Sequence, residues 1–172
     1  MIELKKIIRD IPDFPKKGIL FKDITPALEN AECFAHIIDE FYAEFKDKKI
    51  DKIAVIESRG YLFGVPLAYK LNCGLSLIRK PGKLPAETIK ESYNLEYGSN
   101  TLEIHADTIK KGENVLIIDD LLATGGTVEA ACKLIRRLEG NIVATAFLIE
   151  LKDLKGREKL EKYAPVWALL EY

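Results

Sequence analysis

Apolar residues recur along the chain in two rhythms, helical spacings and short continuous runs. Phe34, Ile37, Ile38, Phe41 and Phe45 follow a helical spacing and predict a helix over 31–47. The continuous runs predict buried strands over 52–56, 75–79, 115–119, 142–149 and 166–170, and further helices are expected over 2–9, 61–71, 126–138 and 154–161. Because strands alternate with helices, the pattern predicts one α/β domain over 1–172, with a twisted, mainly parallel sheet flanked by helices.

Two stretches lack this regularity. Residues 10–30 are rich in proline and predict an irregular segment with a short strand near 19–21. Residues 80–92 contain Pro81, Gly82 and Pro85 and predict a long, mobile loop. Short strands near 94–97 and 101–105 are expected to pair as a hairpin across a Gly-Ser-Asn turn.

Residues 115–127 combine a buried strand, an acid pair and a glycine-rich turn before a helix. Asp119 and Asp120 are expected to end the strand, and Ala123-Thr124-Gly125-Gly126-Thr127 follows. The first amides of a helix have no partner inside it and lie at the positive end of its dipole, so this turn can bind a phosphate. Neither the glycine pattern for dinucleotides nor the lysine of a nucleoside-triphosphate loop is present. One phosphate beside two carboxylates suits a sugar phosphate, whose hydroxyls can donate to the acids.

A second turn with anion-binding residues, Glu57-Ser58-Arg59-Gly60, also joins a predicted strand to a predicted helix. Arg59 adds a permanent charge and a planar fork of donors that suits phosphate oxygens. Both turns follow strands of a parallel sheet, so we expect them at the same edge. Two anion sites imply a ligand with phosphates at two ends, such as 5-phosphoribosyl 1-diphosphate. A surface salt bridge at Arg59 and a solvated acid pair at 119–120 are the alternative interpretations.

Composition narrows the classes of function. Apolar residues make up 48% of the 172 and charged residues 31%, as in globular proteins. The net charge of −1 leaves no basic face for nucleic acid, and no apolar run approaches the roughly 20 residues that span a membrane. The three cysteines form no C-x-x-C pair and are predicted to be buried free thiols. Together with an N-terminus unlike a signal peptide, they predict a cytoplasmic protein.

Residues 117–127 resemble the ribose-phosphate signature of the type I phosphoribosyltransferases, and Leu-Leu-Ala-Thr-Gly-Gly-Thr is most similar to the adenine-specific branch. Residues 13–26 resemble the family's hood segment and 92–98 its S-Y-x-L-E-Y-G segment, so the resemblance extends from 11 to 172. It implies the type I fold with a small N-terminal hood that selects the base (10–30) and a flexible catalytic lid loop (79–100). It also implies formation of AMP and diphosphate from adenine and 5-phosphoribosyl 1-diphosphate (PRPP) in purine salvage, with Mg²⁺, by a homodimer.

The resemblance also implies roles for individual residues. Glu96 would transfer the proton that adenine loses, with Arg59 as a second catalytic residue and Tyr97 shaping the lid. The ribose 5-phosphate site would comprise Asp119, Asp120, Ala123, Thr124, Gly125, Gly126 and Thr127, and the diphosphate site Ser58, Arg59, Arg79, Lys80 and Lys83. Adenine would stack between Phe21 and Leu151 and bond to the main chain around Leu20 and Lys22, where the family has arginine. Magnesium would be held mainly by the substrate, so no protein ligand is named.

Several alternatives stay open at the level of sequence. Glu96 could be a strand-surface carboxylate, the lid cations a solvated basic loop, and Phe21 an ordinary core aromatic. The base could be another purine, although a 6-oxopurine pocket would typically need a lysine side chain near the base. A non-enzymatic regulator could keep the sugar-phosphate motif as a sensor, but the chain offers neither a DNA-binding module nor a basic face. Sequence does not decide whether the lid covers its own subunit's site or whether a cis peptide occurs near Ser58 and Arg59.

Overall fold

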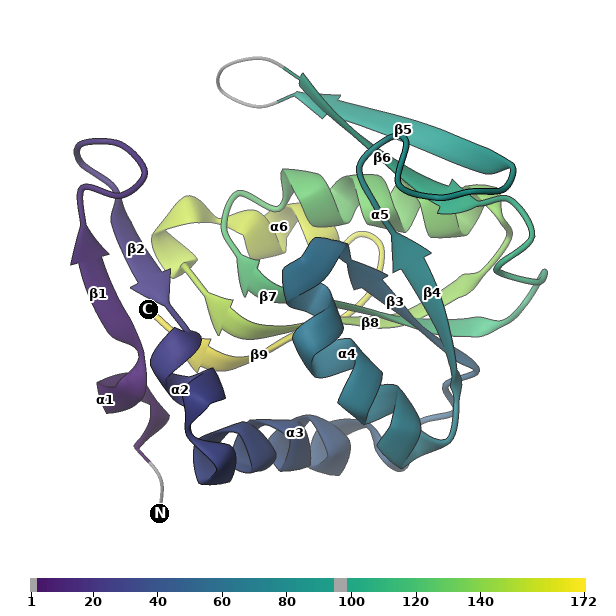
Figure 1. Cartoon of the computed structure of the whole chain (residues 1–172). Coiled ribbons are helices and arrows are strands. Elements are labelled where there is room, and N and C mark those ends of the chain that lie inside the picture. Colours follow the sequence, from purple (N-terminus) through teal and green to yellow (C-terminus); the bar gives the residue numbers. More distant parts are fainter. Residues whose placement is uncertain (1–2, 95–98) are drawn as a thin grey trace.

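The computed structural model describes residues 3–94 and 99–172. Along the chain the elements are α1 (Leu4–Ile7), β1 (Arg9–Pro12), β2 (Leu20–Asp23), α2 (Thr25–Glu29), α3 (Ala31–Phe45), β3 (Lys52–Ile56), α4 (Glu57–Leu71), β4 (Gly74–Ile78), β5 (Thr88–Asn94), β6 (Ser99–His105), β7 (Asn114–Leu122), α5 (Gly126–Arg137), β8 (Asn141–Glu150), a 3-10 turn η1 (Lys152–Leu154), α6 (Gly156–Leu160) and β9 (Val166–Glu171). Figure 1 shows their arrangement around a central sheet.

The central sheet has five parallel strands in the order β4-β3-β7-β8-β9. Alternate residues of β3 enter two separate apolar clusters, with Ile53 and Val55 in one and Ala54 and Ile56 in the other. Helices α3 and α4 cover the first face, and α5 and α6 cover the second (Figure 1). Burial on both faces explains why these strands are continuous apolar runs, and it confirms the predicted α/β fold.

Two boundaries at the carboxyl edge of the sheet differ from the prediction. Strand β7 does not end at the acid pair but continues through Asp119 and Asp120 to Leu122. Its neighbour β8 supplies register partners as far as Glu150, so sheet pairing overrides the weak strand propensity of the acids. Helix α4 begins at Glu57 rather than at residue 61, and the predicted anion turn is therefore the helix's first turn.

The predicted hairpin register is wrong. Strands β5 and β6 pair from Thr88 with His105 to Asn94 with Ser99, so Ser99 and Asn100 belong to β6 and not to a turn, and residues 95–97 of the expected strand lie outside the described residues. Strand β5 begins at Thr88, six residues earlier than the strand expected near 94–97, which shortens the irregular loop predicted over 80–92. This two-stranded sheet packs against α5 and stands apart from the central sheet, as Figure 1 shows.

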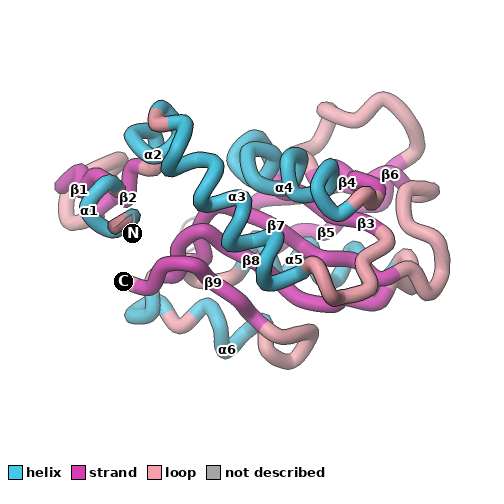
Figure 2. Tube along the Cα trace, turned by 90° about the horizontal axis from the view of Figure 1, so that it is seen from below, coloured by secondary structure: helices cyan, strands magenta, loops and turns pink. Residues whose placement is uncertain are grey.

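Residues 3–30, which include the segment 10–30 expected to form the hood, lie at one end of the molecule in Figure 2. The short strand expected near 19–21 is present as β2. Its partner β1 and the short helix α2 were not predicted, and the helix expected over 2–9 is reduced to α1 within the described residues.

The structure also bears on the expectations about membrane-spanning segments and cysteines. Within the described part of the chain, no helix combines the length and apolar character needed to cross a bilayer. All three cysteines are free, as predicted, but Cys73 is only half-buried while Cys33 and Cys132 are buried.

Candidate active site

A cavity of about 420 Å³ opens at the carboxyl edge of the central sheet. It lies between the turn that follows β7, the first turn of α4, the segment after β4 and the β5–β6 hairpin. Its lining comprises Ile56, Glu57, Ser58, Arg59, Lys80, Tyr93, Asn100, Leu102, Asp119 and residues 121–128. Both turns predicted to bind anions therefore border one space, as expected for turns that follow neighbouring parallel strands.

The turn over 123–127 lines this cavity and is tightly curled. Gly125 caps α5 with a φ of 79°, a conformation that side chains disfavour. A Cβ atom at Gly125 would also lie 2.7 Å from the carbonyl oxygen of Gly156, so neighbouring backbone excludes any larger residue. Because α5 starts at Gly126, its unpartnered first amides and positive dipole end lie at the cavity. The turn can therefore hold one phosphate.

The two acids have different surroundings. Asp119 is half-buried and lines the cavity, whereas Asp120 is only 3% exposed and is not among the lining residues. Asp120 Oδ2 lies 3.2 Å from Nε of Arg59, and its Oδ1 is buried without a hydrogen-bond partner in the described part of the chain. Burial raises the pKa of Asp119 well above its usual value, and the adjacent charge of Asp120 raises it further. Burial also raises the pKa of Asp120, and Arg59 opposes that rise.

The first turn of α4 is held close to β7. A Cβ atom at Gly60 would meet the carbonyl oxygen of Ile118 at 2.8 Å, so glycine is required for this approach. Glu57 has a left-handed φ of 47°, and its Oε1 accepts from the backbone N–H of Lys80 at 2.6 Å and from Nε of Arg79 at 3.2 Å. Among the described residues the cis peptide bond is Phe14–Pro15, not a bond near Ser58.

The predicted diphosphate residues are only partly brought together. Ser58, Arg59 and Lys80 line the cavity. Arg79 instead pairs with Glu57 and lies over the ring of Tyr61, 5.3 Å from its centroid. Lys83 is exposed and does not border the cavity. Their roles stay predictions.

The predicted adenine residues lie mainly in the hood. Phe21 packs edge-to-face on Phe14 with ring centroids 5.1 Å apart, and both line a second cavity of about 250 Å³. Leu20 is exposed, and Lys22 is buried, with its ammonium 2.6 Å from Asp10 and 3.9 Å from the ring centroid of Tyr172. These hood residues do not border the main cavity.

Leu151, the predicted second face of the adenine site, follows β8 and donates its backbone N–H to Leu122 at 2.9 Å. This bond joins it to the end of β7. Glu96 and Tyr97, the predicted proton-transfer and lid residues, lie outside the described residues.

Sequence reasoning gave no role to eight lining residues: Ile56, Glu57, Tyr93, Asn100, Leu102, Leu121, Leu122 and Val128. Tyr93 is the most informative, because its hydroxyl accepts a hydrogen bond from the Thr127 hydroxyl at 3.1 Å. It belongs to the recognised 92–98 segment, but its contact spans 34 positions, so no local pattern indicates it.

Known proteins of one family are similar to this chain over nearly its whole length. The family described as phosphoribosyl transferase domain matches residues 24–171. The chain is 61% identical over 170 residues to an adenine phosphoribosyltransferase from Halothermothrix orenii, covering 99% of both chains. It is similar to the crystal structure of adenine phosphoribosyltransferase from Thermoanaerobacter pseudethanolicus, with a TM-score of 0.95 at 51% identity and coverage of 99% and 98%.

A third relative was solved with ligands. It is the adenine phosphoribosyltransferase of Saccharomyces cerevisiae, complexed with an imino-altritol bisphosphate and adenine. Its TM-score to this chain is 0.91 at 46% identity, and the match covers 97% of this chain and 96% of the yeast chain.

Proposed function

Because the chain belongs to the family of adenine phosphoribosyltransferases, we propose that it makes AMP and diphosphate from adenine and PRPP, as a step of purine salvage. The observation that carries this proposal is the shared cavity. The phosphate turn, the acid Asp119 and the cations Arg59 and Lys80 border one space of about 420 Å³, which suits a sugar with phosphate at both ends.

The substrate would lie across this cavity in a defined direction. The 5-phosphate occupies the amides and hydroxyls of 123–127, and the ribose hydroxyls donate to Asp119. The diphosphate lies against the first turn of α4, where Ser58 and Arg59 are exposed, and toward Lys80. Asp120 acts from behind the cavity wall, because it pairs with Arg59 and so orients the guanidinium.

The reaction forms a bond between a ring nitrogen of adenine and the anomeric carbon, and the bond from that carbon to the diphosphate oxygen breaks. Positive charge develops on the sugar and negative charge on the leaving group. Arg59 and Lys80 offset the latter, and Glu96 takes the proton released by adenine. Arg79 and Lys83 join the diphosphate when the segment after β4 closes over it, and Tyr97 shapes the closed lid.

Magnesium fits this cavity as an ion bound mainly through substrate oxygens and water. The described residues contain no cluster of three or more His, Cys, Asp or Glu side chains, whereas Asp119 presents a carboxylate to the cavity that would hold the ion's water shell. When bound, the ion neutralises charge on the diphosphate.

Adenine would enter between the hood and the end of β8. Phe21 offers an aromatic face, Leu151 an aliphatic one, and the main chain around Leu20 and Lys22 a donor and an acceptor. Lys22 already pairs with Asp10, so its side chain is engaged away from the base, which fits recognition through the backbone.

We also propose a cytoplasmic homodimer. Leu62, Val65 and Tyr69 are exposed at helical spacing on α4, and Tyr69 is 88% exposed. Such an apolar stripe is typical of a surface that another chain covers. Light scattering that gave the mass of one 19.4 kDa chain at micromolar concentration would contradict the dimer. The free cysteines suit a reducing compartment.

The direct test is turnover of PRPP with adenine, hypoxanthine and guanine in turn, followed by release of diphosphate. We expect adenine to be preferred by several orders of magnitude in kcat/KM. A site built to hydrogen-bond the donors and acceptors of one base discriminates by roughly 10⁴-fold against a base whose groups leave the site's polar atoms unpaired. Preference for a 6-oxopurine would establish the alternative, a transferase for another purine base. Binding of AMP without turnover of any base would instead favour a ligand-sensing protein.

A further inference from the structure

The start of α6 forms the outer wall of the phosphate turn. A Cβ atom at Gly156 would lie 2.2 Å from the carbonyl oxygen of Ala123 and 3.0 Å from the backbone nitrogen of Gly125. Gly156 is buried, and Lys155 before it adopts a left-handed φ of 51°. The two backbones are therefore in direct contact, and a shift of Gly156 would be transmitted to the turn that is proposed to hold the 5-phosphate.

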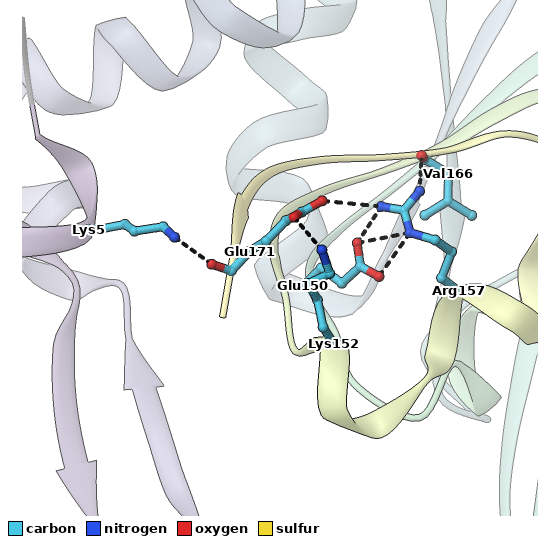
Figure 3. Close-up of polar contacts among 6 residues, drawn as sticks. All are labelled: Lys5, Glu150, Lys152, Arg157, Val166 and Glu171. Carbon is cyan, nitrogen blue, oxygen red and sulfur yellow. Dashed lines mark hydrogen bonds and ion pairs between the residues drawn. The ribbon is translucent and has the colours of Figure 1, made fainter.

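The residue after Gly156 is held by several polar contacts, drawn in Figure 3. Nε of Arg157 lies 3.0 and 3.1 Å from the two carboxylate oxygens of Glu150, and its Nη2 contacts the same carboxylate. Nη1 donates to the carbonyl oxygen of Val166 at 2.6 Å. The guanidinium thus joins α6 to the last residue of β8 and to the first residue of β9.

The ion pair is more than a surface contact. The Glu150 side chain is only 4% exposed and that of Arg157 is 30% exposed, so the pair is shielded from solvent and its geometry is constrained. The bidentate arrangement is one that arginine forms and lysine does not. The hydrogen bond to Glu150 raises the pKa of the Arg157 guanidinium, which keeps the pair charged.

Glu150 also lies next to the proposed adenine contact. The following residue, Leu151, bonds to Leu122 at the end of β7, just before the phosphate turn. The outer part of the network, where Lys152 pairs with Glu171 at 2.7 Å and Lys5 donates to the Glu171 carbonyl, is exposed. The buried part is therefore concentrated behind the phosphate turn.

We propose that Glu150 and Arg157 are positioning residues for the 5-phosphate: their ion pair holds Gly156 against Ala123 and Gly125 and so fixes the curvature of the phosphate turn. This inference rests on the proposed function. Neither side chain borders the cavity, so they act through the backbone of α6 and not by touching the substrate.

The test compares Arg157→Met, Arg157→Lys and Glu150→Gln with Arg136→Met. Arg136 is a matched control, because it also donates to backbone carbonyls, those of Lys162 and Tyr163, but beyond the far end of α6. We measure KM for PRPP, KM for adenine, kcat, the Kd of AMP by calorimetry and the melting temperature of each variant.

We expect Arg157→Met and Glu150→Gln to raise KM for PRPP and the Kd of AMP by about ten- to a hundredfold, since small misplacements of binding groups have effects of this size. KM for adenine should change little, and Arg157→Lys should restore part of the loss. Arg136→Met should leave all the kinetic constants near those of the unmodified chain.

Two outcomes would overturn the positioning role. One is a lower melting temperature with an unchanged KM for PRPP, which would make the pair merely structural. The other is an equal change in both KM values. If Arg157→Met does not fold, Glu150→Gln and Arg157→Lys carry the same test. An unmodified chain that neither turns over PRPP nor binds AMP would instead refute the proposed function.

Discussion

The phosphate turn and the β5–β6 hairpin border the same cavity, but they are held by different interactions. The turn follows β7, which is paired on both sides, and residues 115–118 of that strand are 0% exposed. Complete burial of such side chains stabilises by about 1.5–3 kcal/mol each. The hairpin is a separate two-stranded sheet. Leu102 and Ile104 of β6 are buried in the apolar cluster that includes α5, and polar contacts hold other parts of the hairpin, including the backbone bridge between Arg79 and Glu103 and the bond from Arg137 to the Lys90 carbonyl.

This difference separates two tasks of the site. A turn fixed by the central sheet is preorganised, so it can bind the proposed phosphate without rearrangement. Strand β5 is paired only with β6, and none of residues 88–93 is fully buried, so this strand can move more easily than β7. It follows the segment whose cations are proposed to approach the leaving group. Thr127 and Tyr93 join the two regions through one hydroxyl pair at 3.1 Å. Changes in the phosphate turn and at the acid pair should therefore impair activity more than changes in the hairpin.

The largest effect is expected from the double variant Asp119→Asn with Asp120→Asn. Loss of the ribose acceptor and of the partner of Arg59 should lower kcat/KM by roughly 10³-fold or more, by analogy with removal of a preorganised electrostatic group. Activity with PRPP and adenine measures this. Comparable turnover in the double variant would contradict the assignment of the ribose to this edge of the sheet.

The same variant makes an opposite prediction for stability. Burial raises the pKa of both acids, so at neutral pH each ionised carboxylate destabilises the fold, and wild-type stability should rise as pH falls through their folded-state pKa values. The double variant should melt at the same or a higher temperature at neutral pH and lose that dependence. The single variants separate the roles, since Asp119 borders the cavity and Asp120 does not.

Sequence predicted the rigid region far better than the hairpin, for physical reasons. A buried parallel strand, an anion turn and an amphipathic helix each have a local signature, so 115–137 could be placed almost completely. That β7 continues through two acids depends on pairing with β8, which no local pattern reveals. The hairpin strand 88–94 is largely polar, and its position depends on packing against α5, so the sequence indicated only a loop there.

The site residues likewise fall into those that a local pattern indicates and those that only the fold reveals. The residues of the phosphate turn, and Ser58 and Arg59 in the first turn of α4, could be named from the sequence because their chemistry is local. The positions of Tyr93 and Arg157 were not, because each acts through a partner brought close by the fold. In the expected hood, the strand β1 was missed because its pairing with β2 spans the irregular turn over 13–19 and its last residue is Pro12.

A medium effect is expected from Gly125→Ala. The left-handed φ costs about 1–2 kcal/mol for a residue with a Cβ, and the contact with the Gly156 carbonyl forces the turn to open. KM for PRPP should rise by about tenfold or more. Gly112→Ala is the matched control, because Gly112 also has a positive φ, 80°, while a Cβ there would meet no atom of the described residues within 4 Å. Gly112→Ala should lower stability without changing KM for PRPP. Equal changes in KM for the two variants would show that the phosphate turn is not more rigidly organised for binding than the rest of the chain.

The smallest effect is expected from Glu103→Gln, on the hairpin side. The carboxylate is 2% exposed and accepts from the Gly82 N–H at 2.9 Å and the Thr88 hydroxyl at 3.3 Å, with Lys90 at 3.5 Å. Burial alone would raise its pKa, but Gly82 and Lys90 bring the pKa below its usual value. The ionised Glu103 carboxylate therefore stabilises the fold above the unfolded-state pKa, and this stabilisation is lost as pH falls through the folded-state pKa. The Glu103→Gln variant should lack this loss of stability in acid.

Because Glu103 fastens the segment that carries Lys80 and Lys83, its neutralisation should raise KM for PRPP by only about threefold while costing about 1–3 kcal/mol of stability. The control is Glu91→Gln on the same hairpin, where the carboxylate pairs with Lys133 and Arg137 of α5 instead. That variant should leave KM for PRPP unchanged. A loss from Glu103→Gln as large as that from the Asp119 and Asp120 double variant would mean that the hairpin, and not the sheet, organises the substrate.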